Sequence, residues 1–200
     1  MSKYRQSIDL DQVKMFTIEK QNSSSASRFL NPELLLTAVP VVPGMIVADF
    51  GCGNGYYSVA AAALVGNKGE VHAIDIQEDA LSQTSTLAKL MGLRNVVTKQ
   101  SDLEKSGASD LEQTSCDLIM MAGVLHQAQK KEDVIREAYR VLKTGGKLLV
   151  VEWKPESALG PALSDRIEPA VAKAMLEKQG LRPINELPAG TFHYALLYQK

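Results

Sequence analysis

Short apolar runs alternate with amphipathic segments along most of this chain. Runs of strand type, apolar and often β-branched, are found at 46–49, 70–75, 95–100, 116–122 and 147–152. Apolar residues recur at helical spacing between and after these runs, at 57–65, 79–91, 130–143 and 167–180. Such alternation of strands with helices is typical of α/β proteins with a parallel sheet, so we predict that fold class.

The C-terminal end of the chain departs from this alternation. Two strand-like runs, 181–187 and 191–199, are joined only by Pro188-Ala-Gly190. A parallel return needs a connection of about a dozen residues, so the last two strands are expected to be antiparallel. We therefore predict a doubly wound seven-stranded sheet, mostly parallel with an antiparallel final strand and with helices on both faces.

The N-terminal part of the chain divides into an arm and a capped helix. Residues 1–28 contain a mixed pattern and a Ser-rich link, and we expect a partly ordered arm there. The main domain is expected over 29–200. Asn31 can cap a helix that starts at Pro32, where the missing N–H costs nothing. This helix could lie over the strand ends as a lid, or it could only pack on the domain.

Composition and charge exclude several classes of protein. With 45% hydrophobic and 22% charged residues, the chain has the composition of an ordinary globular domain. The net charge is −1 and no basic face is visible, so we expect no nucleic-acid partner. The apolar runs are too short to span a membrane, and the N-terminus lacks a signal-peptide core. Cys52 and Cys116 form no CxxC pair, which favours a reducing, cytoplasmic location and no metal site.

A glycine-rich turn between the first strand and the following helix is the main functional signal. It reads Asp49-Phe-Gly51-Cys-Gly53-Asn-Gly55, with glycine at three alternate positions. Glycine reaches positive φ without a steric penalty and lets the backbone approach a ligand closely. The spacing differs from the dinucleotide motif G-x-G-x-x-G, and the missing Lys of an ATP-binding loop argues against phosphoryl transfer. The turn alone also fits other nucleotide-binding domains.

The string from Asp49 to Gly55 resembles motif I of the class I S-adenosylmethionine-dependent methyltransferases, and the order of elements over 29–200 is similar to theirs. The resemblance implies a Rossmann-like fold, S-adenosylmethionine as cofactor, and in-line displacement of its methyl group. It also implies that Gly51, Gly53 and Gly55 bring the backbone to the methionine part of the cofactor. Asp49 would attract the cofactor's ammonium group. The resemblance extends to the ubiquinone/menaquinone-biosynthesis-like group, which implies a small, partly apolar acceptor.

Further cofactor contacts are expected after the second and third strands. Asp75 ends the second strand, twenty-four residues after Gly51, about where a carboxylate binds a ribose diol. Asp often caps a helix instead, but the acidic residues that follow can start the next helix, which leaves Asp75 free. Ile76 is expected in the same contact. The resemblance implies that Asp102 accepts from the adenine amine and that Leu103 packs on the ring; a capped turn is the alternative for Asp102.

The acceptor side is expected at the ends of the fourth and last strands. An acceptor that loses a proton needs a base, and His126 is the candidate because it follows the fourth strand and titrates near neutral pH. His126 could instead pack on the adenine or cap a turn. Tyr56 or Tyr57 could lie near the sulfonium, or could only cover the helix. His193 and Tyr194 are expected to line the acceptor pocket.

Two other functions remain open from the sequence. A non-catalytic cofactor-binding or scaffold protein could keep the fold without turnover, although the intact glycine motif argues against it. A nicotinamide oxidoreductase is disfavoured by the glycine spacing and by the terminal hairpin. The arsenic-methylating relatives need several cysteines, and Cys52 is best explained as a small apolar side chain rather than a nucleophile.

Overall fold

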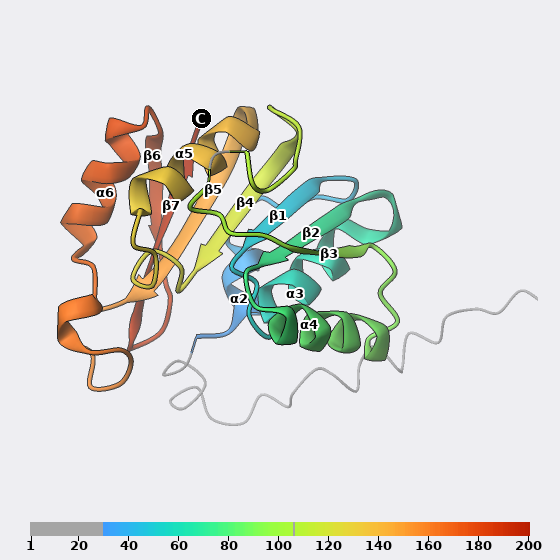
Figure 1. Ribbon diagram of the computed structural model, residues 1–200, viewed down its shortest axis with the longest axis horizontal. Helices are drawn as coiled ribbons and strands as arrows, with labels where there is room; N and C mark the ends of the chain where they lie inside the picture. Colours follow the sequence, from blue (N-terminus) through green and yellow to red (C-terminus); the bar gives the residue numbers. More distant parts are fainter. Residues whose placement is uncertain (1–29, 106) are drawn as a thin grey trace, which may run out of the picture.

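The computed structural model describes residues 30–105 and 107–200, which form one seven-stranded sheet with helices on both faces (Figure 1). The strands are β1 (Ile46–Phe50), β2 (Glu70–Asp75), β3 (Val96–Gln100), β4 (Cys116–Ala122), β5 (Leu142–Trp153), β6 (Arg182–Leu187) and β7 (His193–Gln199). The helices are α2 (Pro32–Thr37), α3 (Tyr56–Val65), α4 (Glu78–Leu90), α5 (Lys131–Val141) and α6 (Pro169–Lys178), with short 3-10 turns η1 (Gly66–Lys68) and η2 (Leu163–Asp165). Within these described ranges, no helix has the length and apolar character to cross a membrane.

The strand order confirms the predicted fold class. The order across the sheet is β3-β2-β1-β4-β5-β7-β6, and neighbouring strands from β3 to β5 are parallel. Strand β7 inserts between β5 and β6 and is antiparallel to both, and its antiparallel pairing with β6 agrees with the short link at residues 188–192. The arm expected over residues 1–28 lies outside the described residues.

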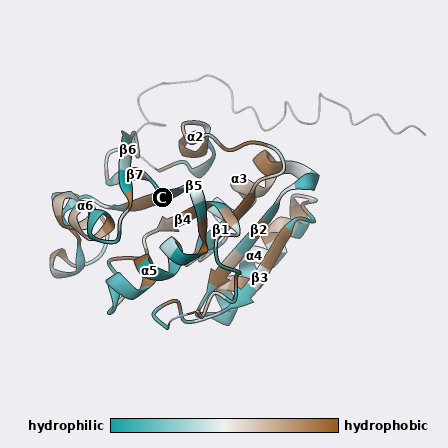
Figure 2. Ribbon diagram, turned by 90° about the horizontal axis from the view of Figure 1, so that it is seen from above, coloured by the Kyte–Doolittle hydropathy of each residue, from teal (hydrophilic) through white to brown (hydrophobic). Residues whose placement is uncertain are grey.

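The inner strands β1, β2, β4, β5 and β7 send side chains into two separate cores, one on each face of the sheet. In β1, Val47 packs with α2 and α3, whereas Ala48 and Phe50 pack with α5 and α6. Helices α2, α3 and α4 therefore cover one face and α5 and α6 the other (Figure 1). Figure 2 shows α2 and α3 on one side of the strands and α5 on the other. Burial on both faces explains why the central strands are apolar throughout.

Local sequence signals set most element boundaries. The Asn31 side chain accepts the Leu34 N–H at 3.0 Å and Pro32 opens α2, which confirms the predicted cap. Helix α5 ends earlier than predicted, at Val141, and β5 begins at the next residue instead of at Lys147. The early start arises because Leu142 pairs with Cys116 before a register shift in the sheet.

The parallel strands β1 to β5 all end at one edge of the sheet, and this edge positions the candidate site. From β1 the chain continues to β2 on one side, and β4 lies on the other side. Ligands of open α/β sheets bind at such a switch point, outside the carboxyl ends of the strands. The glycine turn of residues 51–55 lies there.

Candidate functional site

A cavity of about 620 Å³ opens at this carboxyl edge. It is lined mainly by the segments that follow β1, β2, β3 and β4, by the last residues of β5, by Val134 of α5 and by the first residue of β7. Nine residues that the sequence predicts for the site line the cavity: Asp49, Gly51, Gly53, Tyr56, Asp75, Ile76, Asp102, Leu103 and His193. The structure does not bring the other three, Gly55, His126 and Tyr194, to the cavity wall.

The three motif glycines all have positive φ, but they serve different purposes. A Cβ on Gly51 would lie 2.7 Å from a Val124 methyl carbon, and a Cβ on Gly55 would lie 2.9 Å from the Thr84 Cα. These two glycines let the turn pack against its neighbours. A Cβ on Gly53 would meet no atom within 4 Å, so this residue presents open space on the cavity side. Of the three, Gly55 is therefore explained by packing against α4 and not by ligand approach.

Asp49 is a buried carboxyl in the cavity wall, with only 1% of its surface exposed. The Ser58 hydroxyl, from the first turn of α3, donates to Asp49 Oδ2 at 2.6 Å. Burial, with a smaller contribution from the negative charge of Asp75, raises the pKa of Asp49 to about 7, and the Ser58 hydrogen bond only partly opposes this. A cation beside Asp49 would therefore be stabilised and would favour its ionised form.

Asp75 is not the free carboxylate that the sequence suggested. Its Oδ2 accepts the Gly53 N–H and its Oδ1 accepts the Gln77 N–H, each at 2.9 Å. The side chain thus ties the glycine turn to the start of α4, where Gln77 is the N-cap residue. Each carboxylate oxygen has a second lone pair, so a diol could still be bound at the cavity side.

Asp102 and Leu103 form the turn after β3. Asp102 Oδ1 accepts the Glu104 N–H at 3.1 Å, and its Oδ2 lies 3.3 Å from Lys105 Nζ. These contacts, led by the Glu104 N–H, lower the pKa of Asp102. Asp102 therefore caps this turn, which is one of its two predicted roles. It also lines the cavity, as the other role, a contact with adenine, requires. Leu103 is buried with the apolar residues beneath α5.

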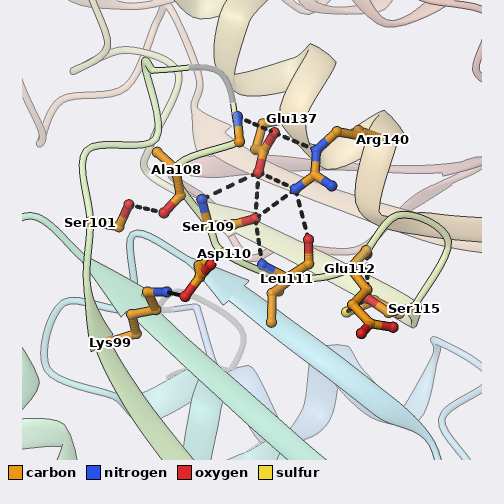
Figure 3. A network of polar contacts seen from close by, with 12 residues as sticks. Lys99, Ser101, Ala108, Ser109, Asp110, Leu111, Glu112, Ser115, Glu137 and Arg140 are labelled. Atoms are coloured by element: carbon orange, nitrogen blue, oxygen red, sulfur yellow. Dashed lines mark hydrogen bonds and ion pairs between the residues drawn. The ribbon is translucent and has the colours of Figure 1, made fainter.

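A buried carboxylate on α5 anchors the loop that continues from this turn (Figure 3). Glu137 accepts the N–H of Gly107 at 3.1 Å and of Ser109 at 3.2 Å, as well as the Ser109 hydroxyl. Arg140 donates to the same carboxylate at 2.9 and 2.7 Å and to the Leu111 carbonyl at 2.8 Å. Burial would raise the pKa of Glu137, but these hydrogen bonds outweigh it and lower the pKa to about 2.

Sequence reasoning missed this anchor, because it joins the loop to a helix residue about thirty positions further along the chain. The one available signal was the Glu137–Arg140 pair at i,i+3 on the helix.

His126, the predicted catalytic base, is not among the residues that line the cavity, although its neighbours Val124 and Gln127 are. Its Nδ1 is 2.8 Å from Glu152 Oε2, and Glu152 Oε1 accepts the Leu125 N–H at 2.7 Å. Glu152 is fully buried near the end of β5, so its carboxylate needs these donors. The position of the imidazole is therefore explained by its hydrogen bond with the buried Glu152 carboxylate.

The two predicted residues at the start of β7 point in opposite directions. Tyr194 turns away from the cavity, and its hydroxyl donates to the Ile167 carbonyl at 3.0 Å. His193 lines the cavity and packs on Trp153, with ring centroids 4.0 Å apart and planes at 42°. Adjacent residues of a strand face opposite sides, so only one of the pair can reach the site. Tyr57 also lines the cavity and is buried, whereas Tyr56 lies at the mouth with 61% of its surface exposed.

Comparisons with known proteins agree with this architecture. A family model described as a methyltransferase domain matches residues 42–186. The arsenite methyltransferase of Aquipseudomonas alcaligenes is 32% identical over 117 residues, which is 56% of this chain and 34% of that protein. The ubiquinone/menaquinone biosynthesis C-methyltransferase UbiE of Shewanella sp. (strain W3-18-1) is 37% identical over 116 residues, 57% of this chain and 45% of that protein. The chain thus spans less than half the length of these two relatives.

Among solved structures, the chain resembles a SAM dependent methyltransferase from Aquifex aeolicus along nearly its whole length. The TM-score is 0.78 at 26% identity, and the match covers 96% of this chain and 98% of that one. The family model covers well over half of the chain, and the strand order with its inserted antiparallel β7 agrees with it. The chain belongs to the methyltransferase domain family and has the fold of the class I S-adenosylmethionine-dependent enzymes.

Proposed function

We propose that this protein binds S-adenosylmethionine and transfers its methyl group to a small, partly apolar acceptor. The observation that carries the proposal is the charge of the cavity. Five carboxyl side chains line it, and none of its described lining residues is a Lys or an Arg; the five are Asp49, Asp75, Asp79, Asp102 and Glu104. Such a wall favours a ligand with positive charge, as a sulfonium and an ammonium group provide.

The residues present fit each part of that cofactor. Asp75, already oriented by two backbone N–H groups, would accept the ribose hydroxyls. Asp102 would accept from the adenine amine, with Ile76 and Leu103 against the ring. Asp49 would lie by the cationic end, near the open backbone at Gly53. When bound, S-adenosylmethionine supplies an activated methyl group whose departure leaves the bonding electron pair on sulfur.

The task left to the protein is to orient the acceptor and to exclude water, which can contribute about 7–11 kcal/mol to such a displacement. The acceptor half of the cavity is mainly apolar and aromatic, with Leu30, Tyr56, Ala122, Val151 and Trp153 in its wall. We therefore propose an acceptor that is small and partly apolar.

Cysteine chemistry is not part of the proposal. Cys52 is the one cysteine that lines the cavity within the described ranges, and its thiol contacts Thr84. Burial raises the pKa of Cys52 to about 12, so no thiolate is available to bind arsenic near neutral pH. The arsenite activity named for one relative is therefore not carried over to this chain. Both cysteines are free and buried, which suits the reducing cytoplasm that we propose as its location.

Calorimetric titration with S-adenosylmethionine and with S-adenosylhomocysteine tests the proposal. We expect saturable binding of both, weakened by about tenfold or more in Asp75→Asn, because a hydrogen bond to a charged group is lost. Asp165→Asn, in an exposed turn away from the cavity, is the matched control. Absence of binding to the unsubstituted protein would refute the proposal. Binding without transfer of a labelled methyl group to any small molecule of a cell extract would instead indicate a non-catalytic protein.

A further inference from the structure

Two buried polar atoms in the cavity wall have no hydrogen-bond partner within the described part of the chain. They are the hydroxyl oxygen of Tyr57 and Nδ1 of His193. Nearly all buried polar atoms of native proteins are paired, because an unpaired one loses its hydration without compensation. Both side chains line the same cavity, so a molecule bound there is the natural source of the missing partners.

The two atoms come from aromatic side chains on two different elements that line the same cavity. Tyr57 comes from the first turn of α3, and His193 comes from the start of β7. Trp153, at the end of β5, packs on the His193 ring at 4.0 Å. The loop after β5 lies against the indole of Trp153. A Cβ added to Gly160 of this loop would lie 2.6 Å from the nearest indole carbon atoms. The His193 and Trp153 rings, tilted by 42° to each other, thus form an aromatic part of the cavity wall.

The two polar groups are complementary in hydrogen bonding. Burial, together with the nearby charge of Asp49, raises the pKa of Tyr57, so its hydroxyl remains a donor at neutral pH. Burial lowers the pKa of His193 below its ordinary value, so its ring is neutral and one ring nitrogen offers a lone pair. An anionic acceptor would find no Lys or Arg among the described lining residues.

We propose that Tyr57, Trp153 and His193 form the acceptor subsite, and that it takes a flat, uncharged molecule with one hydroxyl or N–H group. The heteroatom of that group accepts from the Tyr57 hydroxyl, and its hydrogen is donated to Nδ1 of His193. The ring of the molecule packs along Trp153. This inference rests on the proposed function, because it needs the cofactor in the half of the cavity at the glycine turn.

Two simple probes test the subsite without a known acceptor. Phenol has the ring and the O–H group, whereas anisole has the same ring and no donor. Their affinities are measured by NMR titration of the protein saturated with S-adenosylhomocysteine. We expect phenol to bind about tenfold more tightly than anisole, which corresponds to one or two added hydrogen bonds.

Variants of Tyr57 and His193 test whether these two residues cause the preference for phenol over anisole. Tyr57→Phe and His193→Gln should each reduce the phenol-to-anisole ratio several-fold, with S-adenosylhomocysteine affinity unchanged. Tyr139→Phe on α5 and His72→Gln on β2 are matched controls outside the cavity and should keep the full ratio. If His193→Gln folds poorly, His193→Phe keeps a ring against Trp153 and removes the nitrogens.

The outcomes separate this inference from the proposed function. A ratio that neither variant changes, or phenol binding that never saturates, would overturn the subsite while cofactor binding stands. Failure of the unsubstituted protein to bind S-adenosylhomocysteine would overturn the proposed function, and the subsite with it.

Discussion

The raised pKa of Asp49 leads to one prediction for cofactor binding and another for the stability of the cofactor-free protein. The pKa of its buried carboxyl is raised to about 7, and within the described residues it accepts from the Ser58 hydroxyl and pairs with no cationic side chain. A cationic cofactor beside Asp49 selects the ionised form. Binding should therefore weaken as the pH falls through 7, and it should release a proton below that pH.

The magnitude follows from the pKa alone. With a pKa of about 7, the carboxyl is about nine-tenths ionised at pH 8 and about one-tenth ionised at pH 6. If only the ionised form binds the cofactor well, the dissociation constant should rise about tenfold over this range. Asp49→Asn should bind weakly at both pH values and should remove most of the dependence on pH.

The cofactor-free protein should become less stable as the pH rises, whereas cofactor binding should become stronger. The folded-state pKa of Asp49 lies above the unfolded value of 3.8, so the folded state binds the extra proton between these values. The contribution of Asp49 to stability is therefore lost as the pH rises from about 4 to 7, by roughly 4 kcal/mol at most. Asp49→Asn should accordingly raise the melting temperature at pH 8 while it weakens binding.

Isothermal titration of S-adenosylmethionine in two buffers of different ionisation enthalpy measures both the affinity and the released proton. Thermal melts of the cofactor-free protein at pH 5.5 and pH 8 supply the stability arm. A dissociation constant that is the same at pH 6 and pH 8, together with no proton release at pH 6, would refute this account of Asp49. A melting temperature of Asp49→Asn below that of the unsubstituted protein at pH 8 would contradict the stability argument.

Four further substitutions test the supports of the site. Glu137→Gln should lower the free energy of unfolding by about 2–3 kcal/mol and weaken S-adenosylhomocysteine binding, as melts and calorimetry would show. In the unsubstituted protein, the contribution of Glu137 to stability should be lost as the pH falls from about 4.5 to 2. Gly55→Ala should abolish cofactor binding in calorimetry, because φ is +82° and a Cβ meets backbone, whereas Gly53→Ala, with open space, should be milder. Gly160→Ala should displace Trp153 and weaken phenol binding, seen by NMR, without changing cofactor affinity.

The sequence was sufficient for the fold because its signals are local. Strand and helix periods, the Asn31 cap and the short link before His193 each act within a few residues. The glycine turn was equally readable, since positive φ at Gly51, Gly53 and Gly55 is a local demand on the backbone. Cofactor-side residues follow directly from these signals, because parallel strands bring their carboxyl ends to one edge.

The acceptor side depends instead on contacts between distant residues. His126 follows a strand end as a catalytic base would, but its ring is paired with Glu152, twenty-six residues later, and it does not line the cavity. His193 and Tyr194 were predicted together, and the pleat of β7 sends only His193 into the cavity. Which of the two β7 residues faces the cavity depends on how β7 pairs with β5, and the position of His126 depends on Glu152 in another strand, so neither followed from residue type and spacing alone.

Three buried carboxyl groups show why the cavity needs a positively charged ligand. Glu137 has Arg140 and two backbone N–H groups, and its pKa lies at about 2. Glu152 has the Leu125 N–H and the His126 ring. Asp49 is the one of the three that lines the cavity, and Ser58 gives it a single hydroxyl donor. Since ionised buried carboxylates need cations or several donors, the cationic ligand that we propose would supply the charge that the neighbours of Asp49 do not.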